Sequence, residues 1–277
     1  CRASMVVTVF DGVFGAHACL ALHKSACTRG LGHALYVRDQ TPQTPLEHAM
    51  ESFLRGIGDD APFVEYWSRQ EWKHIEAHAD VDEALAAGGG PQRFPVHGHV
   101  LYLSVGPRVR GPTCVWEPSN GNRFGGSLIT VPAREGRVLR FDGSLQHAVP
   151  RPVDVWTAPF AIRESGPAGE FVRSVVLFNT WRKPPLDVER EEPEVGATLD
   201  ETGGVQAADR DEWELASLHN SLLLPQPGRP ATRAKIWLLG DEARRQQAER
   251  TLAMAVDGEA LNAALTLTER CTQLERS

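Results

Sequence analysis

The stretch between residues 64 and 181 constrains the fold most, because it is a series of short β-rich runs separated by turn residues. The clearest run, residues 99–105 (HVLYLSV), is almost continuously apolar, as in a buried strand. The other expected strands of this stretch lie at residues 64–72, 111–116, 127–131, 137–141 and 171–181. Short strands with turn signals at regular spacing are typical of a β-sandwich or barrel. We therefore predict a mainly β fold with flanking helices.

The segments on either side are predicted to support this β core. Residues 187–212 are acidic and poor in aromatic residues, which indicates a solvated loop. The expected elements outside the core are strands at 5–10, 34–38 and 234–239, and helices at 16–28, 46–54 and 241–275, the last as one or two helices. We predict a single domain over residues 1–277. It would contain an N-terminal support segment (1–63), a β core (64–181), and an acidic loop with a C-terminal helical segment (182–277).

A metal site is the first functional hypothesis, and it starts from His78 and Asp80. Side chains alternate along a strand, so a His and an Asp two residues apart point to the same face. His147 follows the Asp142-Gly143 turn and can return beside them. Two imidazoles and one carboxylate form a facial set that suits Fe(II) and leaves three metal positions open. Asp82 is an alternative carboxylate, although a helix or turn start is the better interpretation.

Arg173 is the second functional candidate. It lies in the middle of an apolar strand pattern (VRSVVLF), where an unpaired guanidinium would be costly to bury. A buried anion would explain its presence, because arginine binds a carboxylate through two parallel hydrogen bonds. The alternative is an arginine that faces outward or forms a salt bridge.

A series of motifs in one order connects these candidates to a known family. The motifs are His78-x-Asp80, Leu101-Tyr102-Leu103-Ser104, Gly111-Pro112-Thr113, the Pro132, Gly136 and Phe141 pattern, His147 with Pro150, and Arg173 with Trp181. Over about residues 76–181 the chain resembles the Fe(II)/2-oxoglutarate-dependent dioxygenases, and within them the prolyl-4-hydroxylase-like branch. The resemblance implies a double-stranded β-helix, also called a jelly roll. It also implies His78, Asp80 and His147 as catalytic metal ligands.

The resemblance implies further cofactor and substrate roles. Arg173 would bind 2-oxoglutarate and Tyr102 would hydrogen-bond it, while Asn179 and Trp181 are candidates to line the site. Fe(II) and 2-oxoglutarate would be required together with dioxygen, with ascorbate as a candidate further cofactor. The reaction would oxidise a C–H bond and release succinate and carbon dioxide. The substrate is left open between a peptide side chain and a small metabolite, because the loops at 117–126 and 153–170 that would select it carry no readable motif.

Two departures from the family pattern weaken the transfer of prolyl specificity. Prolyl hydroxylases of this branch usually carry Lys where this chain has Arg173. The separation between His147 and Arg173 is also longer than usual, because of an insert at residues 153–170.

Two alternative classes compete with the oxygenase interpretation. A cupin, also a β-barrel, would use His97 and His99 as an H-x-H motif, but residues 100–106 lack the carboxylate that should follow. We therefore interpret both histidines as structural. A non-enzymatic jelly-roll binding module is the other alternative, and the intact set of His78, Asp80, His147 and Arg173 argues against it.

Composition restricts the partners. The net charge of −7 disfavours nucleic acid as a partner, and with it a nucleic-acid demethylase. No apolar run approaches the roughly 20 residues that span a bilayer, so no membrane is expected. The five cysteines form no C-x-x-C pair, which is typical of reduced thiols. We therefore expect an intracellular, cytoplasmic protein, with no targeting segment visible.

Overall fold

A computed structural model describes residues 7–30, 32–73, 75–106, 109, 112–116, 128–149, 172–191 and 205–215. The predicted strand at 234–239, the predicted helices at 241–275 and the two predicted substrate loops lie outside these residues. Within the described ranges, none of the helices combines the length and the apolar character that a membrane crossing requires.

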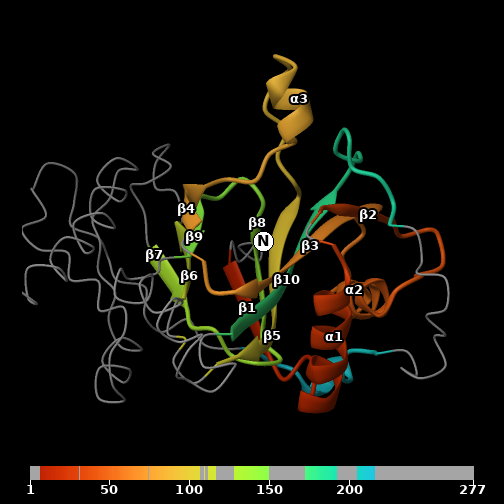
Figure 1. The fold of residues 1–277 in the computed structure, drawn as a ribbon, viewed down its shortest axis with the longest axis vertical. Helices are drawn as coiled ribbons and strands as arrows, with labels where there is room; N and C mark the ends of the chain where they lie inside the picture. The colour runs from red at the N-terminus through yellow and green to blue at the C-terminus, as the bar shows by residue number, and fades with distance from the viewer. Residues whose placement is uncertain are drawn as a thin grey trace, which may run out of the picture.

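Antiparallel β-structure exceeds helix in the described chain (Figure 1). The strands are β1 (Val7–Asp11), β2 (Ala34–Val37), β3 (Phe63–Glu71), β4 (Ile75–His78), β5 (His97–Val105), β6 (Thr113–Trp116), β7 (Leu128–Val131), β8 (Val138–Asp142), β9 (His147–Val149), β10 (Val172–Trp181) and β11 (Glu214–Leu215). The helices are α1 (Ala16–Thr28), α2 (Pro45–Gly56), α3 (Glu83–Ala87) and the short 3₁₀ helix η2 (Arg210–Glu212).

The strand order confirms the predicted jelly roll. The larger sheet has the order β11-β1-β8-β5-β10-β3-β2, and the smaller sheet has the order β4-β9-β6-β7. Between β3 and β10 the chain crosses from one sheet to the other after every strand except β6, which is followed by its neighbour β7. This connectivity closes two antiparallel sheets over one core. Strands β1, β2 and β11 extend the larger sheet beyond the jelly roll.

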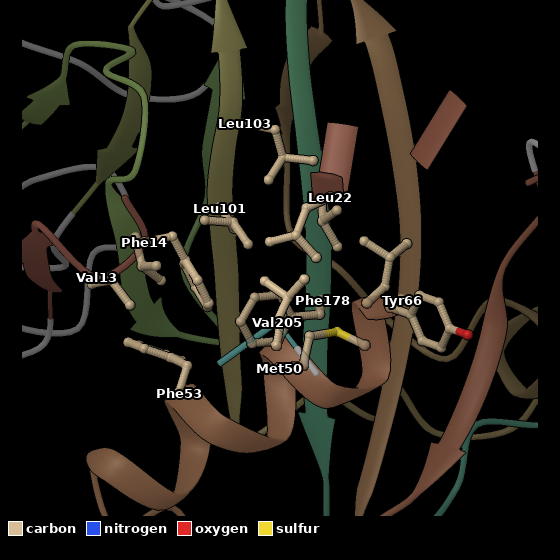
Figure 2. Close-up of a cluster of buried hydrophobic side chains, with 14 of the residues drawn as sticks. Val13, Phe14, Leu22, Met50, Phe53, Tyr66, Leu101, Leu103, Phe178 and Val205 are labelled. Atoms are coloured by element: carbon tan, nitrogen blue, oxygen red, sulfur yellow. The ribbon is translucent and has the colours of Figure 1, made fainter. Parts of the chain in front are cut away.

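Side-chain alternation divides the interior into two layers. On β10, Val175 faces the smaller sheet, whereas Val176 and Phe178 face the helices. Figure 2 shows Phe178 beside Met50 and Phe53, which α2 directs toward the larger sheet. Helices α1 and α2 therefore cover the outer face of the larger sheet and leave its inner face for the site.

The start of α2 has a clear local cause. Thr44 is the N-cap residue, and its hydroxyl accepts a hydrogen bond from the Glu47 amide at 3.1 Å. Pro45 occupies the first helical turn, where its missing N–H costs nothing. This helix confirms the predicted one at 46–54 and places Phe53 in the core.

The acidic segment at 187–212 differs from the expected solvated loop at its described C-terminal end. Val205 is buried in the same core as α2, and the segment continues into Trp213, which stacks on Phe53 at a centroid distance of 5.4 Å. β11 then pairs with β1. Composition averages over the whole segment, whereas a few apolar side chains are enough to dock its end against the core.

Replacing Trp213 by alanine tests this docking. We expect Trp213→Ala to lower the free energy of unfolding by about 3–5 kcal/mol, because it leaves a cavity against Phe10 and Phe53. Urea denaturation measures the change. Leu215→Ala is the control, since Leu215 is 53% exposed and its loss should change stability by no more than about 0.5 kcal/mol. Equal stability of the two variants would contradict the docking.

Candidate metal centre

Strand pairing brings His78 and His147 together. β4 runs antiparallel to β9, and His78 lies directly opposite His147 in this pair. Asp80 follows two residues after His78, and its Oδ1 lies 3.5 Å from His78 Nε2 and 3.8 Å from His147 Nε2. One potential ligand atom from each residue lies within 4.8 Å of the others. The three residues predicted as metal ligands therefore converge on one point.

Backbone carbonyls orient both imidazoles. His78 Nδ1 is 2.8 Å from the Glu76 carbonyl oxygen, and His147 Nδ1 is 3.3 Å from the Leu145 carbonyl oxygen. A carbonyl can only accept, so each Nδ1 donates and each Nε2 keeps its lone pair. Both lone pairs are available next to Asp80, as a metal site with neutral imidazole ligands requires.

Asp80 is held as an ionised carboxylate. Asn179 Nδ2 donates to its Oδ2 at 3.1 Å, which leaves Oδ1 for the two imidazoles. Burial alone would raise the pKa of Asp80, but His147, His78 and the Asn179 amide together lower it to about 2. One negative charge beside two imidazoles fits a divalent cation, because it offsets part of the metal's charge.

The pKa values of the two histidines are shifted in opposite directions. Burial would lower the pKa of His78, but its contacts with Asp80 and the Glu76 carbonyl raise it above the usual value. Burial lowers the pKa of His147, so this imidazole stays neutral. A proton on His78 therefore competes with a metal ion, and metal affinity should fall as the pH decreases.

Asn179→Ala tests the orientation of the carboxylate. We expect metal affinity to fall by about 10–100-fold, as is usual when a residue that orients a metal ligand is lost. Fe(II) titration under anaerobic conditions measures it. Thr180→Val is the control, because this neighbouring buried hydroxyl has no hydrogen-bond partner among the described residues. Unchanged affinity in Asn179→Ala would show that the amide does not orient Asp80 for a metal.

Arg173 lies in the interior between the two sheets. It is 4% exposed, and its Nη2 donates to the hydroxyl of Thr113 at 3.0 Å. The Tyr102 hydroxyl is 2.7 Å from the same Thr113 oxygen. In the described part of the chain no carboxylate pairs with Arg173, and its Nε has no hydrogen-bond partner. Arg173 is therefore a buried cation that can still donate hydrogen bonds to an anion.

Arg173, Thr113 and Tyr102 form a hydrogen-bonded group, called here the Arg173 cluster, and Thr113 connects it to the metal centre. On β6, Val115 lies opposite His147, and Thr113 is two residues away on the same face of the strand. Two residues of strand span about 7 Å, which a five-carbon dicarboxylate can bridge. The sequence motif contained Thr113 but assigned it no role, because a threonine in a strand is common without one.

The alternative ligands do not join the centre. His99 is buried and stacks on Phe178 at a centroid distance of 4.4 Å, with Nδ1 at 3.1 Å from the Phe178 carbonyl. His97 Nδ1 lies 3.2 Å from Asp59 Oδ2. Both histidines are thus held within the larger sheet and its neighbouring loop. This agrees with their interpretation as structural and leaves a cupin-type site without its ligands.

Asp82 and Trp181 have structural contacts instead. Asp82 is the N-cap of α3, where it accepts a hydrogen bond from the Leu85 amide at 3.0 Å, and it pairs with Arg93. This is the helix start that the sequence favoured. Trp181 is fully buried and donates from Nε1 to Glu65 at 3.1 Å. It therefore packs the core next to the site, whereas Asn179 contacts Asp80 directly.

A pocket of about 460 Å³ opens beside the metal centre. His78, Asp80 and Asn179 line one part of it, and His33 and Trp67 line another. His33 stacks on Trp67 at 4.4 Å and contacts Glu65 through Nδ1 at 2.6 Å. This volume is within the range of small-molecule sites. The sequence contained no signal for His33, because no acidic residue stands at a recognisable spacing from it.

These features define a jelly-roll protein with a candidate facial metal centre and a buried cation behind it. No protein-family model matches the chain, and no curated protein matches its sequence.

Solved structures similar to the chain were found at low identity. They include a prolyl-4-hydroxylase of Pseudomonas putida (15% identity, 64% of this chain and 86% of that chain, TM-score 0.40). HygX of Streptomyces hygroscopicus with iron bound is similar at 17% identity over 73% of this chain and 91% of that chain, with a TM-score of 0.40. EctD of S. alaskensis is similar at 14% identity over 67% and 83%, with a TM-score of 0.37. Other structures of HygX and EctD hold 2-oxoglutarate. At these scores, the likeness transfers neither residue roles nor an activity to this chain.

Proposed function

We propose that this chain is an Fe(II)- and 2-oxoglutarate-dependent oxygenase that hydroxylates a C–H bond. The observation that carries the proposal is the pairing of a facial triad with a buried arginine that has no carboxylate partner among the described residues. The donor set of two oriented imidazoles and one ionised carboxylate fits Fe(II). The Nε of Arg173, which has no hydrogen-bond partner in the described ranges, fits the distal carboxylate of the co-substrate.

Each residue of the site has a defined task in this proposal. His78, Asp80 and His147 hold the metal, and Asn179 fixes which oxygen of Asp80 faces it. Arg173 binds the distal carboxylate, with Thr113 and Tyr102 holding the guanidinium in place. When bound, Fe(II) with 2-oxoglutarate and dioxygen supplies the C–H oxidation and releases succinate and carbon dioxide. The protein contributes placement of the reactants and exclusion of water.

The pocket beside the triad is proposed to receive the substrate. Its volume suits a small metabolite or one side chain of a peptide, which are the two substrate classes open from the sequence. The pocket shares His78 and Asp80 with the metal centre, so a substrate in it would lie next to the metal. Ascorbate as a further cofactor stays a prediction.

Anaerobic titration tests the proposed class. Apoprotein is loaded with Fe(II), and 2-oxoglutarate is then added while the visible spectrum is recorded. We expect a metal-to-ligand charge-transfer band, because the 2-oxo acid would bind the metal through both its oxo and its carboxylate oxygens. A folded, iron-loaded protein without this band would contradict the proposal and favour a non-enzymatic binding module.

A further inference from the structure

The inner face of β3 carries a charged residue that neither the metal centre nor the Arg173 cluster uses. Side chains alternate along β3, and Tyr66 and Ser68 face the helices, since Tyr66 packs in the helix-side core and Ser68 donates to the Ala26 carbonyl. Trp67 and Arg69 therefore share the inner face. Trp67 lines the pocket beside the metal centre, and Arg69 is the next inward-facing residue along the strand.

Strand register places Arg69 near Tyr102 and Arg173. Arg69 lies opposite Val175 on β10, and Val175 lies opposite Tyr102 on β5. Arg69 and Tyr102 thus flank Val175 in one row across the larger sheet. Arg173 is two residues before Val175 on the central strand of this row. The two arginines consequently enter the same space between the sheets.

Electrostatics agree with this placement. Burial is the main reason that the pKa values of His147 and Arg173 are lowered, and the positive charge of Arg69 lowers both further. The negative charge of Asp80 in turn raises the pKa of Arg69, against the larger effect of burial. The guanidinium of Arg69 is therefore within electrostatic range of both the metal centre and Arg173.

Arg69 has no partner in the described part of the chain. It is only partly exposed, and it forms neither a hydrogen bond nor an ion pair with any residue there, whereas Arg137 and Arg38 each pair with a carboxylate. The nearby Asp80 is already engaged by two imidazoles and Asn179. A partly desolvated cation without a partner is costly, and a carboxylate would satisfy it.

We propose that Arg69 binds the carboxylate adjacent to the oxo group of the co-substrate, while Arg173 binds the distal carboxylate. This inference rests on the proposed function and adds a second cationic residue to it. A 2-oxo dicarboxylate carries one negative charge at each end, and the site offers two guanidinium groups that pair with no carboxylate of the described chain. Arg69 is not among the residues that line the pocket of about 460 Å³, so a carboxylate of the co-substrate fits its position better than one of the primary substrate.

Two probes separate the two ends of the co-substrate. 2-Oxoglutarate has both carboxylates, whereas pyruvate keeps the 2-oxo acid end and lacks the distal one. Each is titrated into the Fe(II)-loaded protein without dioxygen, by calorimetry and by the charge-transfer band. We expect Arg69→Gln to weaken both probes by the same factor, about tenfold or more. Arg173→Gln should weaken 2-oxoglutarate and leave pyruvate unchanged.

Controls make the result specific to position. Arg182→Gln removes an exposed arginine that pairs with Asp60, and it should change neither affinity. Arg69→Lys keeps the positive charge, so it should bind both probes more tightly than Arg69→Gln does. It also serves as the test variant if Arg69→Gln does not fold stably. Equal binding of both probes by wild type and Arg69→Gln would overturn the inference, as would a loss confined to 2-oxoglutarate. No band in wild type would instead remove the proposed function, and this inference with it.

Discussion

Asp80→Ala is expected to lower the Fe(II) affinity by more than about 100-fold. Loss of a residue that only orients a metal ligand already costs about 10–100-fold, and Asp80 is the anionic member of the triad. Its carboxylate is ionised at neutral pH, because its pKa is lowered to about 2. Without it, two neutral imidazoles would face a divalent cation with no charge compensation. Anaerobic calorimetric titration with Fe(II) measures the change.

His97→Ala is the control for this experiment. His97 contacts Asp59 and lies outside the triad, so its loss should leave iron affinity unchanged. The pair of variants also separates the two metalloprotein classes. With a cupin-type site, the His97→Ala variant would lose iron binding and the Asp80→Ala variant would keep it. That outcome would contradict the facial triad proposed here.

Arg173→Met is expected to weaken 2-oxoglutarate binding by about 100-fold while leaving the apoprotein as stable as wild type or more stable. The first effect follows from removing a charge-assisted, two-bonded carboxylate contact inside the protein. The second follows because the guanidinium is buried without a carboxylate among the described residues. Replacing even a buried ion pair by apolar side chains of similar volume is often neutral or stabilising by about 1–4 kcal/mol, and a charge without a carboxylate partner has less attraction to lose.

Arg137→Met is the matched comparison for Arg173→Met, because Arg137 is paired with a carboxylate. It donates to the buried Asp11 carboxylate at 2.7 and 2.8 Å. Its loss should lower the free energy of unfolding by at least about 1 kcal/mol, since Arg134 alone would then compensate Asp11. Urea denaturation of the apoproteins measures both. If Arg173→Met is strongly destabilised and still binds 2-oxoglutarate, Arg173 is a structural residue.

Local patterns predicted many elements correctly. The helix expected at 16–28 matches α1, and the strand expected at 171–181 differs from β10 by one residue. Alanine and leucine are frequent in α1 and valine is frequent in β10, so local preference and tertiary packing agree. β9 has only three residues, and local sequence does not distinguish so short a strand from a loop, because its pairing with β4 and β6 defines it.

Local sequence pattern does not assign a role to a charged residue within a strand. Arg69 stands in an aromatic strand pattern and received no role from the sequence, although it shares the inner face with Trp67. Alternation shows which residues share a face, but it does not show which face is inward. Only the positions of β10 and of the helices decide that for β3.

The sequence by itself determined the mainly β class and the spacing of His78 and Asp80, because short-range alternation and turn residues are properties of neighbouring positions. The jelly roll was implied only by the family resemblance. The sequence also identified His147 and Arg173 as candidates through motif order. Tertiary structure decided which carbonyls orient the imidazoles and that Asn179 orients the carboxylate of Asp80. It also decided that Arg69 and Arg173 enter the same space. These contacts join residues far apart in the chain, and their geometry depends on sheet register and on the packing of one sheet over the other.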